Sequence, residues 1–248
     1  MSRNQIPRSH EDDHSHHSAA ARRDFLMERT GTTLDHVAGF SFDPETTCGN
    51  IENFIGAAQV PIGVAGPLLI HGEHASGEFY VPLATTEGAL VASYNRGMRV
   101  IHESGGATVT IAQDHMQRSP AFLFASAREA RDFGLWINEN IENIRTVAQG
   151  TTSVGMLEGI TQFAVGPNLY LRFDYTTGDA AGQNMTSKAT DAACQWITSA
   201  YPHNVDFILS GNIDTDKKHS QINTLLSRGK RVIAEVTTTA HTLQNLVG

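Results

Sequence analysis

Three short segments of this 248-residue chain carry side chains that could do chemistry. The first, residues 85–88, holds Glu87 behind two threonines. The second, residues 178–185, contains two glycines and two alanines beside amide side chains. The third, residues 210–218, ends in Lys217 and Lys218 and contains two aspartates. A carboxylate, a small-residue turn and paired ammonium groups can support acid catalysis, phosphate binding and oxyanion stabilisation.

Glu87 stands four residues before Val91, which starts an apolar pattern continued by Tyr94, Met98 and Ile101 at helical spacing. We therefore expect a helix that opens at residues 85–88 and carries Glu87 on its buried stripe. Desolvation would raise the pKa of Glu87, whereas a helix N-terminus would lower it. If desolvation dominates, Glu87 could act as a general acid. An exposed glutamate that stabilises the helix dipole is the equal alternative.

Residues 178–185 would let backbone N–H groups at a helix start approach a phosphate or pyrophosphate. The spacing is not that of the G-x-G-x-x-G fingerprint. An ordinary strand-to-helix turn is therefore the structural alternative.

In residues 210–218, a lysine near a developing oxyanion could stabilise it, and a second lysine beside it would lower its pKa. The alternative is a solvated loop of mixed charge.

The elements that must hold these segments change along the chain. Over residues 120–208 we expect strands near 121–125, 156–165, 169–175 and 205–209, with helices over 128–147 and 180–201. This βαββαβ order is the split βαβ, or ferredoxin-like, motif. A further strand is expected over residues 231–236.

Composition bounds the class of protein. Apolar residues make up 40% and charged residues 18%, which is typical of a globular protein. The net charge of −8 argues against a nucleic-acid binder. Cys48 and Cys194 lack metal-type spacing and are too few for a disulfide framework, and neither a membrane span nor a signal peptide is evident. We expect a cytoplasmic protein without a resident metal.

The composition of residues 1–22 predicts a solvated tail, and a weak metal-binding tract of histidines is the alternative.

Read in order, several segments resemble 3-hydroxy-3-methylglutaryl-CoA (HMG-CoA) reductase. The resemblance runs from about Arg22 to Gly248. The matching segments are residues 52–56, 61–68, 84–93, 95–97, 105–107, 178–185, 210–212, 215–218 and 229–230.

The resemblance implies that two hydrides from a nicotinamide cofactor reduce HMG-CoA to mevalonate and free CoA. Glu87 matches the family's acid that protonates the carbonyl oxygen, and Lys217 matches the lysine that stabilises the oxyanion. The positions matching those that hold the hydroxymethylglutaryl group are Arg118, Ser210, Asp216 and Lys218.

The resemblance also implies the cofactor site, the domain plan and the assembly. Asp179, Gly182 and Asn184 match the dinucleotide-binding segment. Ser153 stands where many NADPH-using relatives place an arginine, so NADPH is expected and NADH is the alternative. The implied fold is α+β, with an HMG-CoA-binding α/β domain of residues 23–119 and 209–248. A ferredoxin-like NAD(P)-binding domain of residues 120–208 would be inserted in it. A homodimer or larger homo-oligomer with shared active sites is implied.

The ending departs from the family pattern. Relatives continue into helices with a second catalytic aspartate and a late histidine, so this chain is expected to be truncated and to turn over poorly alone. Two methionines usual in the cofactor segment are replaced by Ala181 and Gln183. Two alternatives to a reductase remain. One is a non-catalytic module that binds the CoA thioester or has a regulatory role, and the other is a fragment that does not fold by itself.

Overall fold

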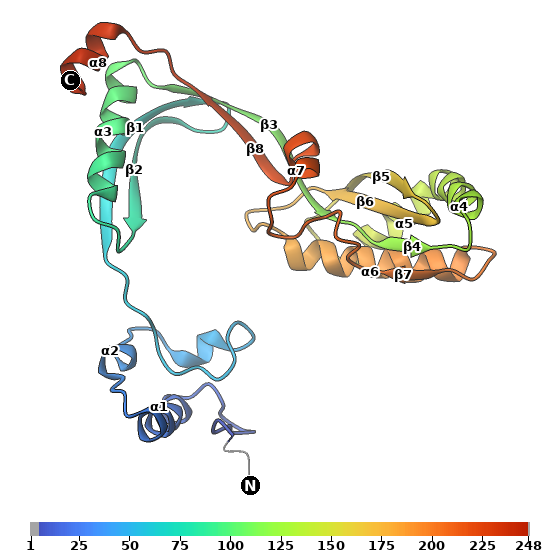
Figure 1. The fold of residues 1–248 in the computed structure, drawn as a ribbon, viewed down its shortest axis with the longest axis horizontal. Helices are drawn as coiled ribbons and strands as arrows, with labels where there is room; N and C mark the ends of the chain where they lie inside the picture. Colours follow the sequence, from blue (N-terminus) through green and yellow to red (C-terminus); the bar gives the residue numbers. More distant parts are fainter. Residues whose placement is uncertain (1–4, 248) are drawn as a thin grey trace. The chain divides into compact units, whose positions relative to one another are not determined.

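The computed structural model describes residues 5–247, so residues 1–4 of the predicted tail lie outside the described part (Figure 1). The chain divides into two compact units. Unit 1 contains the residues up to Leu68, Glu78–His102 and the residues from His241. Unit 2 contains Leu69–Gly77 and Glu103–Ala240. The division differs from the expected boundaries at 120 and 208, because the strand that precedes residue 120 pairs with strands on both sides of that boundary.

Unit 1 begins with structure where a solvated tail was expected. Helix α1 spans His16–Thr30, and the side chain of Ser15 caps it by accepting from the Ser18 N–H at 3.1 Å. The Arg22 side chain is fully buried and donates to the carbonyl oxygens of Pro7, at 2.9 Å, and Phe54, at 3.1 Å. The expectation of a solvated tail through residue 22 was therefore wrong for residues 5–22, because a buried guanidinium ties them to a distant segment.

The other elements of unit 1 include the helix that was expected to carry Glu87. They are α2 (Asp35–Ala38), the short 3₁₀ helix η1 (Pro44–Thr47), most of strands β1 (Ile62–Gly72) and β2 (Ser76–Ala84), α3 (Leu90–Glu103) and α8 (Ala240–Leu246). Helix α3 begins at Leu90, later than expected. Thr85 Oγ1 accepts from the Glu87 N–H at 2.9 Å, and Ala89 has a left-handed φ of 62°. This local turn competes with the helix, so Glu87 lies in an exposed bend before it.

Unit 2 is built on strand β3 (Ala107–Arg118), which connects two sets of strands. Along most of its length β3 pairs with the antiparallel strand β8 (Gly229–Glu235), and its first residues pair with the parallel end of β1. Its last residues pair with β6 (Asn168–Tyr175), where Arg118 lies opposite Phe173. Helix α7 (Gln221–Leu226) precedes β8.

The remaining elements of unit 2 follow the order β4 (Ala121–Leu123), α4 (Ala127–Glu139), α5 (Ile141–Gln149), β5 (Leu157–Val165), β6, α6 (Gln183–Ala200) and β7 (Asp206–Ile208). The strands lie in the order β7-β4-β6-β5, and all neighbours are antiparallel. The single helix expected over 128–147 is two helices. Asn140 interrupts it with φ −107° and ψ 13°, and its side chain donates to the Trp136 carbonyl at 2.9 Å.

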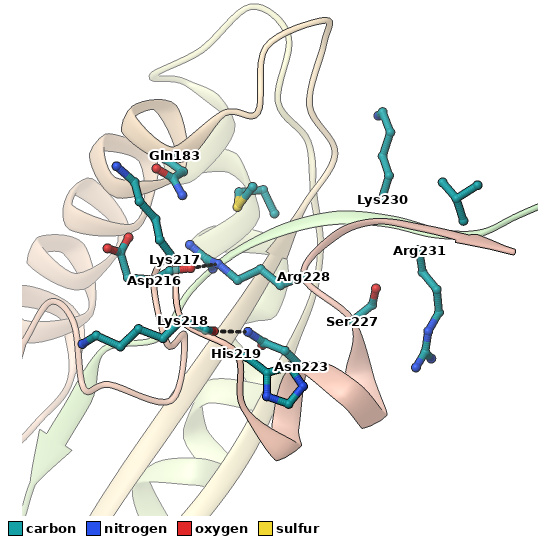
Figure 2. Close-up of a pocket in the computed structure, with 12 residues that line it drawn as sticks. Gln183, Asp216, Lys217, Lys218, His219, Asn223, Ser227, Arg228, Lys230 and Arg231 are labelled. Atoms are coloured by element: carbon teal, nitrogen blue, oxygen red, sulfur yellow. Dashed lines mark hydrogen bonds between the residues drawn. The ribbon is translucent and has the colours of Figure 1, made fainter. Parts of the chain in front are cut away.

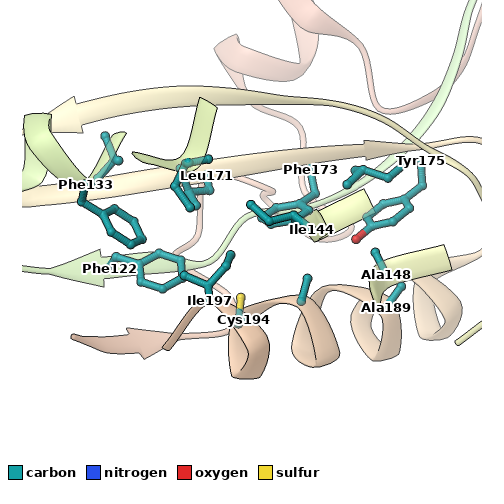
Figure 3. Close-up of a cluster of buried hydrophobic side chains, with 14 of the residues drawn as sticks. Phe122, Phe133, Ile144, Ala148, Leu171, Phe173, Tyr175, Ala189, Cys194 and Ile197 are labelled. Atoms are coloured by element: carbon teal, nitrogen blue, oxygen red, sulfur yellow. The ribbon is translucent and has the colours of Figure 1, made fainter. Parts of the chain in front are cut away.

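The main core lies between this sheet and α4, α5 and α6 (Figure 3). Alternate residues of β6 point into it, as the period-two pattern predicts: Leu171, Phe173 and Tyr175 are fully buried. Helix α6 faces them with small residues such as Ala189 and Ala193, which allow close approach. Burying each large apolar side chain contributes roughly 1.5–3 kcal/mol, so this layer holds the start of α6 in place. None of the helices formed by residues 5–247 has the length and apolarity needed to cross a membrane.

The core makes a stability prediction. Ile197 on α6 is 0% exposed, whereas Ile208 on β7 is 56% exposed. Ile197→Ala should lower the free energy of unfolding by about 2–5 kcal/mol, because a buried cavity remains. Ile208→Ala, the matched control, should change it by less than about 1 kcal/mol. Urea unfolding followed by circular dichroism measures both, and equal losses would contradict this core.

The two cysteines should react differently. Cys194 is fully buried, and burial raises the pKa of its thiol well above the usual range, with Asp191 adding to the effect. Cys48 is exposed. At neutral to mildly alkaline pH, iodoacetamide should modify Cys48 and leave Cys194 unmodified, as mass spectrometry of peptides would show. Denatured protein, modified at both, is the control; rapid native labelling of Cys194 would contradict its placement.

Candidate functional site

A pocket of about 500 Å³ in unit 2 lies among the first residue of α6, the loop before α7 and the start of β8 (Figure 2). It contains three of the predicted substrate or catalytic residues, Asp216, Lys217 and Lys218. Its other lining residues are Met116, Gln183, His219, Asn223, Ser227, Arg228, Lys230, Arg231 and Val232. Cations therefore outnumber carboxylates here, although the whole chain carries a net charge of −8.

The pocket's cations differ in what they bind. Lys230 Nζ pairs with Asp114 at 2.5 Å, and Arg231 donates to carbonyl oxygens at the end of α7, including that of Leu225 at 3.5 Å. Within residues 5–247, neither Lys217 nor Lys218 has a side-chain hydrogen bond or ion pair. Figure 2 shows the Lys217 side chain extending toward Gln183 at the start of α6. Lys217 is thus the ammonium that an incoming oxyanion could engage beside α6.

The loop that carries the lysines is held by side chains from the following segment. Thr215 and Asp216 have left-handed φ angles of 52° and 48°. Arg228 Nε donates to the Asp216 carbonyl at 2.6 Å, and its Nη1 donates to the Gln117 carbonyl on β3 at 2.7 Å. Burial lowers the pKa of Arg228, an effect opposed by the Asp214 carboxylate. One guanidinium therefore fastens the lysine loop to the sheet.

Arg118 and Ser210 come together at a different point, on the carboxylate of Asp214. Arg118 Nη1 lies 2.9 Å from Asp214 Oδ2, and Ser210 Oγ lies 3.1 Å from both carboxylate oxygens. Asp214 is 1% exposed. Ser187 Oγ accepts from Arg118 Nε at 3.1 Å. These two predicted substrate residues are thus neighbours, but each binds an internal aspartate.

The predicted cofactor residues lie at the start of α6. Asp179 is in the exposed loop before it, and Asn184 is in its first turn. Gly182 precedes the helix with φ 81°, and a Cβ there would lie 2.5 Å from Thr177 Cγ2, so both backbone conformation and space favour glycine. No side chain caps this end of the helix, and its first turn contains no acidic residue. These features fit an anionic group at the N-terminus of an 18-residue helix.

Ser153 lies in a turn that packs against the same loop. The N–H groups of Val154 and Gly155 each approach Thr152 Oγ1 at 3.2 Å. A Cβ at Gly178 would lie 2.9 Å from Val154 Cγ1. The structure therefore brings the Ser153 turn beside the 178–182 loop, although they are separate in the sequence.

Glu87 belongs to unit 1, and its surroundings are described within that unit. It is exposed in the bend between β2 and α3. The backbone around it is fixed by Thr85, whose N–H donates to the Pro61 carbonyl at 3.0 Å. Among residues 5–247, no group of three or more His, Cys, Asp or Glu side chains is arranged as a metal site.

The structure adds functional candidates that the sequence did not reveal, Asp214 and Arg228. Asp214 lies inside the segment that was singled out, between Ile213 and Thr215, but no sequence pattern separates it from a solvated aspartate. Arg228 directly precedes the matching pair Gly229-Lys230, so its segment was recognised but its contacts were not. The contacts of both residues join segments that are far apart in the sequence, so they depend on tertiary packing.

Comparisons with known proteins agree on one family. The family model for hydroxymethylglutaryl-coenzyme A reductase matches residues 18–248. The 3-hydroxy-3-methylglutaryl-coenzyme A reductase of Pyrococcus horikoshii is 48% identical over 216 residues, which are 86% of this chain and 52% of the relative. That of Methanothermobacter thermautotrophicus is 46% identical over 228 residues, 91% of this chain and 57% of the relative. The chain thus spans about half the length of the curated relatives it matches.

Solved structures show the same fold. A class II 3-hydroxy-3-methylglutaryl-CoA reductase from Streptococcus pneumoniae, bound to NADPH in open conformations, superposes with a TM-score of 0.60 at 18% identity. The match covers 90% of this chain and 52% of that structure. The fold is therefore a mixed α+β fold similar to class II reductases. With the family model matching most of its length, the chain belongs to the hydroxymethylglutaryl-coenzyme A reductase family.

Proposed function

We propose that this chain is part of an NADPH-dependent reductase that converts HMG-CoA to mevalonate and free CoA. The observation that carries the proposal is the pocket that holds Lys217, Asp216 and Lys218 next to the start of α6. A reduction of a thioester needs a fixed cation at the carbonyl oxygen and a neighbouring place for the hydride donor. A cytoplasmic location is part of the same proposal.

Lys217 would stabilise the oxyanion of the reacting carbonyl. Its ammonium has no partner in residues 5–247, while Arg228 holds the backbone of its loop through the Asp216 carbonyl at 2.6 Å. A fixed backbone with a free ammonium suits a group that must meet charge as it develops. Lys218, Asp216, Arg118 and Ser210 would hold the hydroxymethylglutaryl group, with the cations serving its free carboxylate.

Glu87 would be the proton donor to the carbonyl oxygen. Support comes from the match of residues 84–93 to the family and from the bend that presents its carboxylate outside any helix. Because the side chain is exposed in this chain, the proposal requires that bound substrate desolvate it and so favour its protonated form.

Residues 120–208 would form a ferredoxin-like domain that binds the nucleotide, inserted into a substrate domain of residues 23–119 and 209–248. The antiparallel strand order β7-β4-β6-β5, with helices between the appropriate strands, supports the first part. The uncapped start of α6, with Gly182, Asn184 and nearby Asp179, fits a dinucleotide. When bound, NADPH supplies the hydride.

NADPH is favoured because the superposed reductase from Streptococcus pneumoniae carries it. Ser153, in the turn beside the 178–182 loop, lacks the charge that would grip a 2′-phosphate, so NADH remains the alternative donor. The proposed assembly is a homodimer or larger homo-oligomer with shared active sites. The alternative function is a non-catalytic module that binds the thioester, which the replacement of two methionines by Ala181 and Gln183 motivates.

The cofactor site can be tested by binding. Gly182→Val should weaken NADPH affinity about tenfold or more, because a branched side chain opposes the left-handed φ of 81° and collides with Thr177. Gly159→Ala is the matched control, since a Cβ there meets nothing within 4 Å. Fluorescence titration with NADPH measures both. Equal affinities for the two folded variants would place the cofactor elsewhere.

The catalytic role of Lys217 can be tested by turnover. Oxidation of NADPH with HMG-CoA should fall roughly 10²–10³-fold in Lys217→Ala, because the oxyanion loses its cation. Lys188→Ala, an exposed lysine of α6, should leave the rate unchanged. Thioester binding is measured in parallel by calorimetry. Turnover is measured in a protein extended to the length of the relatives, of which this chain spans about half. Binding without turnover in that extended protein would favour the non-catalytic module, and neither binding nor turnover would contradict both functions.

A further inference from the structure

Arg118 and Ser210, proposed to hold an external carboxylate, both donate to the same internal carboxylate. Arg118 Nη1 lies 2.9 Å from Asp214 Oδ2, and Ser210 Oγ lies 3.1 Å from each of the two oxygens. A guanidinium and a hydroxyl on one carboxylate are the contacts that a bound carboxylic acid would receive. The structure therefore contains a preformed carboxylate-binding site, which the side chain of Asp214 occupies.

The surroundings of Asp214 are strongly cationic. The Asp214 carboxylate opposes the lowering of the pKa of both Arg172 and Arg228 by burial, and the charge of Arg172 adds to the lowering for Arg228. Arg172 Nε and Arg228 Nη2 are buried and have no hydrogen-bond partner among residues 5–247. Arg172 is 1% exposed. Without Asp214, this cluster would be a site of excess positive charge that attracts an anion.

Arg118 would keep its place if Asp214 left. Ser187 Oγ accepts from Arg118 Nε at 3.1 Å and donates to the Gln183 carbonyl at 2.9 Å. These bonds tie the guanidinium to the start of α6, which is held by the core rather than by the 210–218 loop. The Arg118 side chain is 15% exposed, so its guanidinium is not sealed from solvent as Asp214 is.

The loop that carries Asp214 has backbone conformations that its residue types disfavour. Asn212, Thr215 and Asp216 have φ angles of 70°, 52° and 48°, in the left-handed region that residues other than glycine rarely occupy. Such conformations persist only when surrounding contacts maintain them. The Arg118–Asp214 pair is one such contact, and the bond from Arg228 Nε to the Asp216 carbonyl is another. A competing carboxylate on Arg118 would therefore release the Asp214 side chain, while Arg228 still fastens the part of the loop that carries the lysines.

We propose that Asp214 is a specificity-determining residue whose carboxylate occupies the Arg118–Ser210 site, so that an external carboxylate reaches Arg118 only by displacing it. The identity of that external group, the free carboxylate of a hydroxymethylglutaryl substrate, rests on the proposed function. Asp214 thereby sets the affinity of the site, because any external carboxylate must compete with a tethered one.

The test is the affinity of the chain for 3-hydroxy-3-methylglutarate, measured by calorimetry. Asp214→Asn keeps the size of the side chain and removes its charge, so affinity should rise about tenfold or more. Asp206→Asn removes the same charge from an exposed position on β7 of the same unit and should leave the affinity unchanged. Unchanged or weaker binding by folded Asp214→Asn would overturn the proposal and make Asp214 a positioning residue for Arg118.

Two further measurements keep the test decisive if Asp214→Asn does not fold. Asp214→Ser, with a smaller uncharged side chain, should show the same gain. A crystal structure of the unaltered chain saturated with 3-hydroxy-3-methylglutarate should show Asp214 displaced from Arg118; a retained contact at 2.9 Å would overturn the proposal.

Titration with NADPH separates this inference from the proposed function. If Asp214→Asn binds NADPH normally but shows no gain in affinity for 3-hydroxy-3-methylglutarate, the inference is contradicted and the proposed function is not. A gain in carboxylate affinity in a chain that binds neither NADPH nor HMG-CoA defeats the proposed function and leaves the carboxylate site.

Discussion

The buried ion pair between Arg118 and Asp214 is the contact on which the arrangement of the candidate site depends. Arg118 ends the long strand β3, and Asp214 lies 96 residues later in the loop that carries the lysines. A carboxylate that is 1% exposed must be compensated, because an unpaired buried charge would cost several kcal/mol. The pair therefore joins the strand to the loop, and Ser187 extends the connection to α6.

The apolar core gives this polar network a fixed base. Leu171, Phe173 and Tyr175 on β6 pack against α6, while the alternate residues Arg172 and Asp174 lie on the other face of the same strand. One strand thus positions both the core and part of the cationic cluster. The buried Tyr175 hydroxyl pairs with Thr190 Oγ1 at 3.0 Å. This bond satisfies a polar group that would destabilise the core if it were left unpaired. A shift of α6 would disturb the cofactor loop and Arg118 together.

Much of the local structure was predictable because it depends on short-range patterns. The strands expected near 156–165 and 169–175 correspond to β5 and β6, the helix expected over 180–201 corresponds to α6, and the order of matching segments predicted the family. The two helix predictions that were wrong also had local causes. Asn140 broke one predicted helix through its own side chain, and the turn at Thr85 delayed the start of α3 so that Glu87 fell outside it. In both places side-chain hydrogen bonding to the backbone competed with helix propensity.

The sequence alone determined the types and order of the chemical groups: a glutamate near the start of a helix, a small-residue turn before another helix, and a lysine pair in a loop. Only the tertiary structure decided which groups meet. It placed Asp214 on Arg118 and Ser210, fastened the lysine loop through Arg228, and brought the Ser153 turn beside the 178–182 loop. The reason is physical: residue type and local spacing determine what a side chain can bind. Which partner it binds depends on burial and on contacts between segments far apart in the chain, where desolvation makes pairing obligatory.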